Sequence, residues 1–359
     1  MNIVQIVAYY PPHLGGMERF VEALSNQLVA QGSPTKVFTS NQGAGKAHDM
    51  RQNGLFVRYL SSIEIAHTPI IFGLFAALLK QPRDSIFHIH VSQAFTPEIT
   101  MLAAAIRKIP YFAHVHLDVD PSGAMGFLLK PYKRIFLRFV LHHARSVICL
   151  SAEQRQQMIA KYGLEPKQVV VIPNAVDERF FIHREFPAAE FRLLFVGRLA
   201  SQKRVDFLLR MISHIQHPVT LDIVGDGELR GELESYCQTH ALRNVVFHGA
   251  LRGDDLLNKY KQATIAVTSS RKEGQSLALL EAMAAGLPIV ATDGEGITNL
   301  VEGNGIVTPA DEKLFANAID ALLDNEEQIR AISAHEQIAA RQYSWPKLIQ
   351  NLLELYNPQ

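Results

Sequence analysis

The chain has 359 residues, of which 48% are apolar, and its 35 basic and 35 acidic side chains cancel. That length exceeds the size at which a single hydrophobic core stops growing, so we expect two domains, and the balanced charge gives no indication of nucleic acid as a partner. The charge is divided unevenly, however: residues 1–180 hold 18 basic and 12 acidic side chains and the remainder holds 17 and 23, which indicates an anionic partner for the first half or only a solvated face.

Short β-rich runs alternate with helical patterns from end to end. Apolar strands separated by helices indicate parallel sheets with helices on both faces. Eleven strands are too many for one ordinary sheet, so we predict an α/β protein of two Rossmann-like, doubly wound domains with a break near 177–191. The predicted strands are 3–8, 35–39, 86–91, 111–115, 147–150, 169–172, 193–196, 219–224, 245–248, 264–267 and 289–292.

The segment 343–356 is predicted to be a helix that needs a partner to pack against. Ser344 is placed to cap its start, and Pro346 then falls in the first turn, where a missing N–H costs little. One side of this helix is apolar and must be buried, and it carries Trp345, Leu348, Leu352 and Leu355.

Cysteine usage and the apolar runs indicate the cytoplasm. Cys149 and Cys237 form no disulfide framework, as expected in a reducing compartment. The first residues run directly into a strand without the features of a signal peptide, and the most apolar run, 69–79, is too short to span a bilayer. We therefore expect a cytoplasmic protein that is at most peripheral, at the inner face of the cell membrane.

Two His-x-His pairs, His88/His90 and His114/His116, end neighbouring strands. Ligands of parallel α/β sheets collect at these carboxyl ends, and histidine there can orient hydroxyls and move protons. Zinc is a weaker interpretation, because no cysteine or acid at ligand spacing completes a site. His116, which a polar loop follows, is the preferred functional candidate; the alternative is a hydrogen-bonded histidine without a ligand.

Two short motifs are misleading. The stretch "VGDGELRG" follows a strand and opens a helix, but its glycines, at 225, 227 and 231, miss the dinucleotide spacing by one. "DVD" at 118–120 has the spacing of a metal-binding pair of aspartates, yet so short a motif arises easily by chance. We predict neither a nicotinamide site nor a metal site from them.

Phosphate-binding features follow the first strand of each half. Gly15 and Gly16 precede a helix whose backbone amides and dipole can face an anion, although glycines also serve a turn alone. In "FVGRLASQK", Arg198 and Lys203 flank a loop that leads into a helix, which suits a clamp on a phosphate. The alternative for this pair is two solvated cations.

The stretch "EGQSLALLE" holds Glu273 before a predicted helix and Glu281 inside it. Five residues of helix from Ser276 to Glu281 rise by roughly 7.5 Å, too far for two acids that share a proton but suitable for gripping two parts of one ligand. A carboxylate accepts two hydrogen bonds, so Glu281 can hold a ribose diol. With the helix amides at the phosphates between them, the pattern predicts a nucleotide sugar; the alternative is a surface acid and one drawn to the helix dipole.

The sequence here resembles the family-four retaining glycosyltransferases of the GT-B fold. The glutamate pair followed by "AMAAGLPIVAT" is similar to that family's signature. Across nearly the whole chain, further motifs occur in the family's order: "GGMERFVEALSNQLVAQG", "HVH", "IPNAVD", "VGRLASQK", "IVGDGELR" and "YSWPKLI".

The resemblance implies three parts: 1–180 on the acceptor side, 181–342 binding the nucleotide sugar, and 343–359 crossing back onto the first domain. It implies that His116 sits beside the transferred sugar and that Arg198 and Lys203 neutralise the diphosphate. Glu273 would meet the sugar and Glu281 the ribose, without a bound metal or other cofactor. The remaining implied donor-side positions are Gly15, Gly16, Asn174, Gly274, Gln275 and Ser276.

Two positions depart from the family's pattern. Gln275 and Ser276 stand where the family often has an aromatic residue and glycine, and Leu117 follows His116 where aspartate is frequent, with Asp118 one place later. Both positions lie beside the sugar in the family. The identity of the transferred sugar therefore does not follow from the resemblance.

The segment 127–146 mixes apolar and basic residues, among them Lys130, Lys133, Arg134, Arg138 and Arg145. Such a segment can lie on an anionic membrane; the alternative is a solvated helix with a buried apolar side. The membrane interpretation gains support because many members of the family that the sequence resembles use lipid-linked acceptors.

We expect a retaining hexosyl- or N-acetylhexosaminyltransferase that moves a sugar from a UDP- or GDP-sugar to a hydroxyl of a saccharide, lipid-linked or small-molecule acceptor. A bacterial polysaccharide, glycolipid or glycoconjugate pathway is expected. The alternatives are a non-catalytic partner subunit of the same fold, and a sugar-nucleotide epimerase or phosphorylase of similar architecture.

Overall fold

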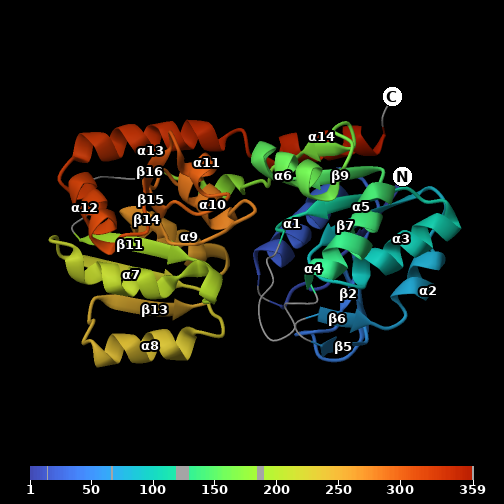
Figure 1. Cartoon of the computed structure of the whole chain (residues 1–359), viewed down its shortest axis with the longest axis horizontal. Coiled ribbons are helices and arrows are strands. Elements are labelled where there is room, and N and C mark those ends of the chain that lie inside the picture. The colour runs from blue at the N-terminus through green and yellow to red at the C-terminus, as the bar shows by residue number, and fades with distance from the viewer. Residues whose placement is uncertain (14, 66–67, 119–128, 184–189, 358–359) are drawn as a thin grey trace. The chain divides into compact units, whose positions relative to one another are not determined.

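The computed structural model describes residues 1–13, 15–65, 68–118, 129–183 and 190–357 (Figure 1). Two compact units divide the chain. Unit 1 comprises Met1–Asn174 and Leu348–Gln359, and unit 2 comprises Ala175–Lys347. Sequence reasoning placed the boundaries after residues 180 and 342, so the change of unit falls six residues earlier and five residues later.

Unit 1 contains an eight-stranded sheet in the order β10-β9-β8-β7-β1-β2-β4-β3. Its pairs are parallel except that β3 runs antiparallel to β4, and β5 and β6 form a separate hairpin. The strands are β1 (Asn2–Ile6), β2 (Thr35–Ser40), β3 (His48–Gln52), β4 (Leu55–Leu60), β5 (Ser62–Ile65), β6 (Thr68–Ile71), β7 (Ser85–Val91), β8 (Tyr111–Val115), β9 (Ser146–Cys149) and β10 (Val169–Val171).

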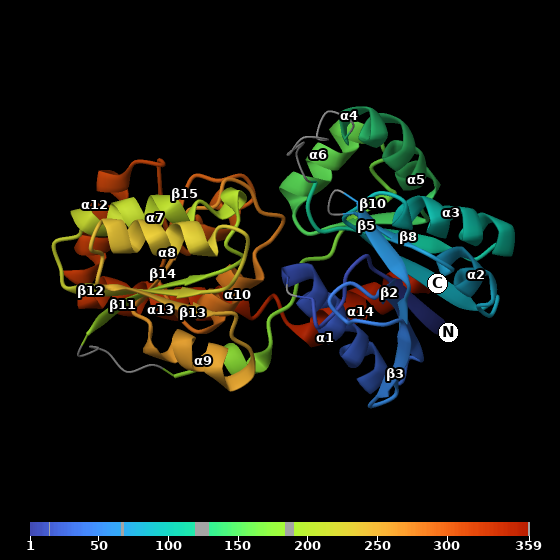
Figure 2. The ribbon, with the colours of Figure 1, turned by 90° about the horizontal axis from the view of Figure 1, so that it is seen from below.

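Helices cover both faces of this sheet (Figure 2). α1 and α14 lie on one face, and α3 and α5 lie on the other (Figure 2). The helices are α1 (Gly16–Ala30), α2 (Leu74–Leu79), α3 (Thr96–Arg107), α4 (Leu129–Tyr132), the π-helical turn η2 (Lys133–Leu137), α5 (Arg138–His143), α6 (Ala152–Tyr162) and α14 (Trp345–Tyr356).

Unit 2 contains a six-stranded, all-parallel sheet in the order β13-β12-β11-β14-β15-β16. α7 and α8 lie on one face of it and α9 on the other (Figure 2), and each face has its own apolar core. Its strands are β11 (Phe191–Val196), β12 (Val219–Val224), β13 (Val245–Gly249), β14 (Ile265–Thr268), β15 (Ile289–Thr292) and β16 (Gly305–Thr308).

The α-helices of unit 2 are α7 (Val205–Met211), α8 (Arg230–Thr239), α9 (Gly253–Gln262), α10 (Leu277–Ala284), α11 (Thr298–Val301), α12 (Glu312–Leu323) and α13 (Glu326–Ala340). Short 3-10 turns are η3 (Glu178–Phe180), η4 (Ser201–Lys203) and η5 (Ile212–His214). No helix in the described ranges is long and apolar enough to cross a membrane.

The predicted doubly wound α/β architecture is confirmed, and each of the eleven predicted strands overlaps an observed one to within two residues at either end. Sequence reasoning missed β3, β4, β5, β6 and β16. β3 and β5 are edge elements with mostly exposed side chains. They therefore lack the buried apolar run that indicates an interior strand of a parallel sheet.

The terminal helix α14 buries its apolar side within unit 1. Leu348, Ile349, Leu352 and Tyr356 are all at most 4% exposed, whereas the predicted contact residue Leu355 is only half-buried. The hydroxyl of Tyr356 also forms a hydrogen bond with Nδ1 of His88 on β7. Aliphatic packing and one polar contact thus hold the end of the chain against the sheet.

Candidate functional site

The unit 2 sheet reverses its strand order at β11, which lies between β12 and β14. At such a switch point the loops that follow the two central strands diverge and leave room for a ligand. Here hydrogen bonds connect those loops: Ser269 Oγ donates to the carbonyl oxygens of Lys203 (2.9 Å) and Arg204 (2.8 Å), and Arg271 N donates to Gln202 O (3.0 Å). The loops after β11 and β14 therefore form one surface.

This surface brings two predicted site residues into direct contact. The ammonium of Lys203 donates a hydrogen bond to Glu273 Oε1 and forms an ion pair with it, and the two side chains are only 19% and 11% exposed. The sequence places them 70 positions apart. In this ion pair each charge neutralises the other, so an anion that binds here must compete with Glu273 for the lysine.

The loop that carries Glu273 is held against the β15–α11 loop by closely approaching backbones. Glu273 N donates to Glu295 O (2.8 Å), and Lys272 Nζ lies 3.1 Å from Glu295 Oε2. A Cβ added to Gly296, whose φ is +76°, would lie 2.1 Å from Glu273 O, and one on Gly294 would lie 2.1 Å from Ser270 O. Sequence reasoning missed these glycines; the signal was "DGEG" directly after a predicted strand.

We expect Gly296→Ala to destabilise unit 2 and to displace Glu273. The left-handed backbone costs about 1–3 kcal/mol for a residue with a Cβ, and the Cβ cannot fit 2.1 Å from the Glu273 carbonyl oxygen. Gly303→Ala is the matched control, because its φ is +82° and nothing lies within 4 Å of its added Cβ. Thermal unfolding and transferase assays on both variants check this. Equal loss of activity in the two would contradict a role for the contact at Glu273.

Glu281 lies in the second turn of α10 and is only 4% exposed. Tyr260 of α9 donates a hydrogen bond from its hydroxyl to Glu281 Oε2 (2.8 Å) and approaches the carbonyl oxygen of Ala278 (3.2 Å). A buried carboxylate needs such donors. Sequence reasoning missed Tyr260, which lies 21 positions before its partner in a helix with no motif of its own.

The start of α10 differs in detail from the prediction. Ser276 is the N-cap residue, as expected from its position, but its side chain makes no capping hydrogen bond. Gly274, Gln275 and Ser276 are half-buried. The hydroxyl of Ser276 is therefore not engaged in capping the helix.

Arg198 lies on the loop after β11 and is exposed. Its guanidinium is 57% exposed and lies 3.2 Å from Glu228 Oε2, so it is accessible to a ligand. The glycines of "VGDGELRG" serve the packing of this loop: an added Cβ would lie 1.8 Å from Gly197 O at Gly225 and 2.5 Å from Leu199 O at Gly227. This close approach explains a glycine-rich turn without a dinucleotide.

In unit 1, Gly15 is the N-cap of α1 and its backbone is extended. An added Cβ there would lie 2.0 Å from Glu18 Oε2, whereas one on Gly16 would meet nothing within 4 Å. Glu18 is buried and bonds to Nδ1 of His13 (3.0 Å). The carboxylate over Gly15 thus lies at the end of α1 where an anion was predicted.

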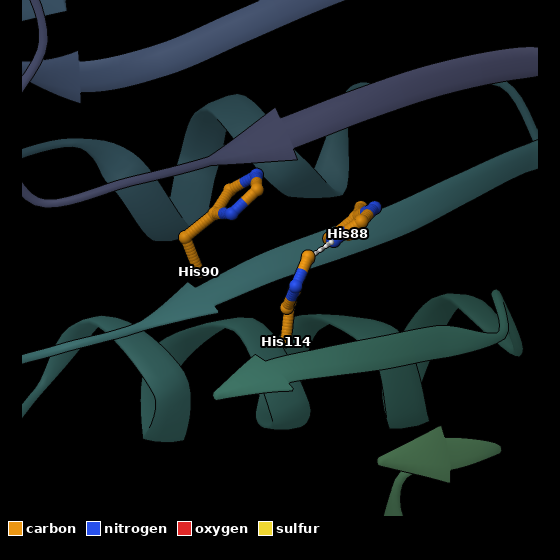
Figure 3. Close-up of side chains that lie close together, drawn as sticks. All are labelled: His88, His90 and His114. Atoms are coloured by element: carbon orange, nitrogen blue, oxygen red, sulfur yellow. Dashed lines mark hydrogen bonds between the residues drawn. The ribbon is translucent and has the colours of Figure 1, made fainter. Parts of the chain in front are cut away.

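The two His-x-His pairs form one cluster on the face of the unit 1 sheet that α1 and α14 cover. His90 pairs directly with His114 in the β7–β8 register, and Figure 3 shows the side chains of His88, His90 and His114 close together. His88 Nε2 and His114 Nδ1 are 3.1 Å apart. His90 Nδ1 and His116 Nε2 are 2.8 Å apart, so the pairs meet as predicted from neighbouring strand ends.

This cluster is also the one group in the described residues that could hold a metal ion, since one nitrogen from each of His88, His90 and His114 lies within 4.8 Å of the others. Nitrogens that ligate zinc at 2.0–2.1 Å are closer to one another than that limit. Both ring nitrogens of His88 and of His90 already have hydrogen-bond partners. The arrangement fits a hydrogen-bonded network better than a metal centre.

Two further residues singled out in the sequence, Asp118 and Asn174, are respectively paired with lysines and buried. Asp118 forms ion pairs with Lys133 and Lys161, and burial raises its pKa less than these two lysines lower it. Asp120, its partner in the possible metal motif, lies outside the described residues. Asn174 is 4% exposed and is the last residue of the first stretch of unit 1.

Sequence comparisons support the resemblance. Residues 14–180 match the profile described as glycosyltransferase family 4, and residues 190–325 match the profile described as glycosyl transferases group 1. The chain belongs to the family-four glycosyltransferases. Together the two matches cover most of this chain, and residues 1–13, 181–189 and 326–359 lie outside them.

Relatives in sequence are glycosyltransferases, and a solved structure shares the fold. The chain is 26% identical to an uncharacterised glycosyltransferase of Methanocaldococcus jannaschii over 99% of this chain and 98% of the relative. It is 26% identical to the O-antigen chain mannosyltransferase C of Escherichia coli over 89% of this chain and 87% of that relative. HepE of Anabaena, solved with UDP and glucose, superposes with a TM-score of 0.80 at 19% identity over 100% of both chains. The fold is GT-B, and the protein is a glycosyltransferase.

Proposed function

We propose that this glycosyltransferase moves a sugar from a UDP- or GDP-sugar to a hydroxyl group with retention of the anomeric configuration. The observation that carries the proposal is the Lys203–Glu273 ion pair where the unit 2 sheet reverses its order. A cation and an acid that are both largely shielded from water suit a ligand with a diphosphate next to a sugar. The Anabaena neighbour was solved with UDP and glucose, which supports this class of donor.

In the proposed mechanism, Lys203 and Arg198 stabilise the departing diphosphate. Positive charge placed where negative charge develops lowers the barrier, so these two cations take the role that a divalent ion has elsewhere. The bond from the anomeric carbon to the diphosphate breaks as the acceptor oxygen bonds to that carbon from the same face. The acceptor proton passes to the departing diphosphate, and no covalent enzyme intermediate forms.

The acids hold the two ends of the donor in this proposal. Glu281 accepts hydrogen bonds from the ribose diol, and Tyr260 keeps its carboxylate oriented with a 2.8 Å hydrogen bond. Glu273 meets hydroxyls of the transferred sugar after the diphosphate has drawn Lys203 away from it. Gly274, Gln275 and Ser276 present the start of α10 beside the phosphates.

Unit 1 supplies the acceptor side. In this proposal His116 contacts the transferred sugar, and Gly15 and Gly16 contact the donor. Asn174 also belongs to the donor-side residues, and it lies where the chain passes from unit 1 to unit 2. The mannosyltransferase of Escherichia coli is named for an O-antigen chain, which favours a saccharide or lipid-linked acceptor in a bacterial polysaccharide, glycolipid or glycoconjugate pathway.

The segment 127–146 suits peripheral contact with an anionic membrane. Residues 127 and 128 and the side chains of 129 and 130 lie outside the described structure, but Ile135, Phe136 and Phe139 are 61%, 56% and 54% exposed. Arg134 and Arg138 beside them are also exposed, and the sequence holds no acid between Asp120 and Glu153. Apolar side chains among cations are typical of a surface that binds anionic lipid.

We expect the double variant Phe136→Ser/Phe139→Ser to lose most of its binding to vesicles of phosphatidylglycerol. Roughly 1.5–3 kcal/mol of apolar transfer is removed for each phenylalanine, and both side chains are mainly exposed, so the fold is retained. Co-sedimentation checks this, with neutral phosphatidylcholine vesicles and the exposed Ile338→Ser variant on α13 as controls. Equal sedimentation of the wild type and the double variant would contradict membrane contact through this segment.

The proposed function is tested by incubating the protein with a panel of sugar nucleotides, with and without acceptors. Release of nucleoside diphosphate, together with a glycoside of unchanged anomeric configuration, supports retaining transfer. An isomerised sugar nucleotide supports an epimerase, sugar phosphate supports a phosphorylase, and no turnover of any donor supports a partner subunit. Any of these three results would overturn the proposal.

A further inference from the structure

A second strand reversal lies in unit 1, between β1 and β7. Gln5 on β1 pairs in register with His88 on β7, and its side chain lies on the same face of the sheet as the histidine cluster. Gln5 is completely buried and His90 is 1% exposed, whereas His116 is half-buried. A chain of three polar side chains therefore runs from the interior of unit 1 toward its surface.

Hydrogen bonds connect these three side chains in order. Nε2 of His90 is 2.7 Å from Oε1 of Gln5, and Nδ1 of His90 is 2.8 Å from Nε2 of His116. Phe20 of α1 packs edge-on against both imidazoles, with ring centroids 6.2 Å from His90 and 5.2 Å from His116. We call Gln5, His90 and His116 the relay, and Phe20 packs against its two imidazoles.

The order of donors and acceptors follows from the amide oxygen of Gln5. An amide oxygen only accepts, so Nε2 of His90 carries the hydrogen. A neutral imidazole has one N–H, so Nδ1 of His90 accepts and Nε2 of His116 donates to it. His116 is then left with an unprotonated Nδ1, since its contact with His90 uses Nε2.

The charge state of the two imidazoles agrees with this order. Burial holds the pKa of His90 well below its usual value and lowers that of His116 to about 3, so both rings are neutral. Nε2 of Gln5 is buried without a hydrogen-bond partner among the described residues, so Oε1 is the atom that connects the amide to His90.

We infer that Gln5 and His90 are positioning residues that fix His116 as a hydrogen-bond acceptor, so that the transferred sugar must offer a hydroxyl hydrogen to Nδ1 of His116. This inference rests on the proposed function, in which His116 meets that sugar. A donor that is deoxygenated, O-methylated or oxidised to a carboxylate at the contacted carbon has no such hydrogen. The relay thereby selects among sugars by one hydroxyl.

The tautomer is measured first, by long-range ¹H–¹⁵N correlation spectra of the full-length protein labelled with ¹⁵N-histidine. We expect His116 to carry its proton on Nε2 in the wild type and to become a mixture of tautomers in Gln5→Met, which removes the acceptor at similar volume. Gln81→Met, at a buried glutamine elsewhere in unit 1, should keep the wild-type tautomer. A wild-type His116 protonated on Nδ1, a Gln5→Met variant with an unchanged tautomer, or zinc that shifts the signals of His88, His90 and His114 together would overturn the relay.

The kinetic consequence is measured with mono-O-methyl analogues of the accepted donor, whose ether oxygen accepts hydrogen bonds but donates none. In the wild type, one analogue should lose roughly 10-fold in kcat/KM, the effect of about one hydrogen bond. In Gln5→Met this loss should be smaller, because part of the His116 population then donates from Nδ1 to the ether oxygen. Gln81→Met, at a buried glutamine elsewhere in unit 1, controls for stability. Equal discrimination in wild type and Gln5→Met overturns the inference and leaves the proposed transfer intact, whereas absence of transfer from every donor overturns both.

Discussion

Lys203→Ala is expected to lower kcat by roughly 100-fold, the order of magnitude for removing one group that stabilises charge in a transition state. Lys203 Nζ is the cation closest to Glu273 and is largely shielded from water, so little else can replace it when the diphosphate departs. The KM for the donor should rise much less than kcat falls, because the charge on the leaving oxygen grows in the transition state. Steady-state kinetics with varied donor at saturating acceptor measures both constants.

A matched control separates this effect from the loss of any lysine. Lys259 in α9 is similarly shielded, at 18% exposed, and lies 3.8 Å from Asp222 Oδ1, but it is not on the loops after β11 and β14. Lys259→Ala should therefore keep kcat within a factor of a few of wild type. If Lys203→Ala behaves like this control, the cation is not part of the reaction.

Glu281→Gln is expected to raise the KM for the donor by about 10- to 100-fold with a small change in kcat. A hydrogen bond to a charged group contributes about 1.5–3 kcal/mol, and the ribose lies away from the bonds that change, so binding is affected more than chemistry. Glutamine retains the shape of the side chain and an oxygen that accepts from Tyr260. Glu281→Ala should raise KM further, because it leaves a cavity beside the Tyr260 hydroxyl as well.

A donor with a 2′-deoxyribose tests whether this acid contacts the diol. The wild type should bind the deoxy donor more weakly than the ribose donor, whereas Glu281→Gln should hardly distinguish them. Tyr260→Phe is the control variant for this test, since it removes the hydrogen bond to Glu281 Oε2 and keeps the charge of the glutamate. The assignment is wrong if Glu281→Gln discriminates between the two donors as strongly as the wild type does.

The sequence was sufficient for the fold class because both sheets consist mainly of buried parallel strands, whose apolar runs are hard to mistake. β3 and β5 were not predicted, because most of their side chains face solvent and they therefore have no such apolar run. β16, with the sequence GIVT, is short and none of its four residues except Thr308 is buried. Edge elements carry too little hydrophobic signal to be separated from loops.

For the site, the sequence identified residue types and left their contacts open. Lys203 and Glu273 were assigned to different groups of one ligand, but the ion pair between them depends on the β11–β14 pairing, which no local pattern encodes. Likewise, Tyr260 contacts Glu281 and Gly296 lies against the backbone of Glu273, and both partners are distant in sequence. The histidine pairs were foreseeable as neighbours, yet their link to Gln5 required the register of β1 with β7.

The central claim is that a nucleoside diphosphate binds where the unit 2 sheet reverses, with its phosphates drawing Lys203 away from Glu273. A crystal structure with UDP or GDP tests this most directly. We predict diphosphate oxygens within about 3 Å of Lys203 Nζ and a ribose on the side of Glu281. A nucleotide bound elsewhere, with the Lys203–Glu273 ion pair intact, would contradict the account.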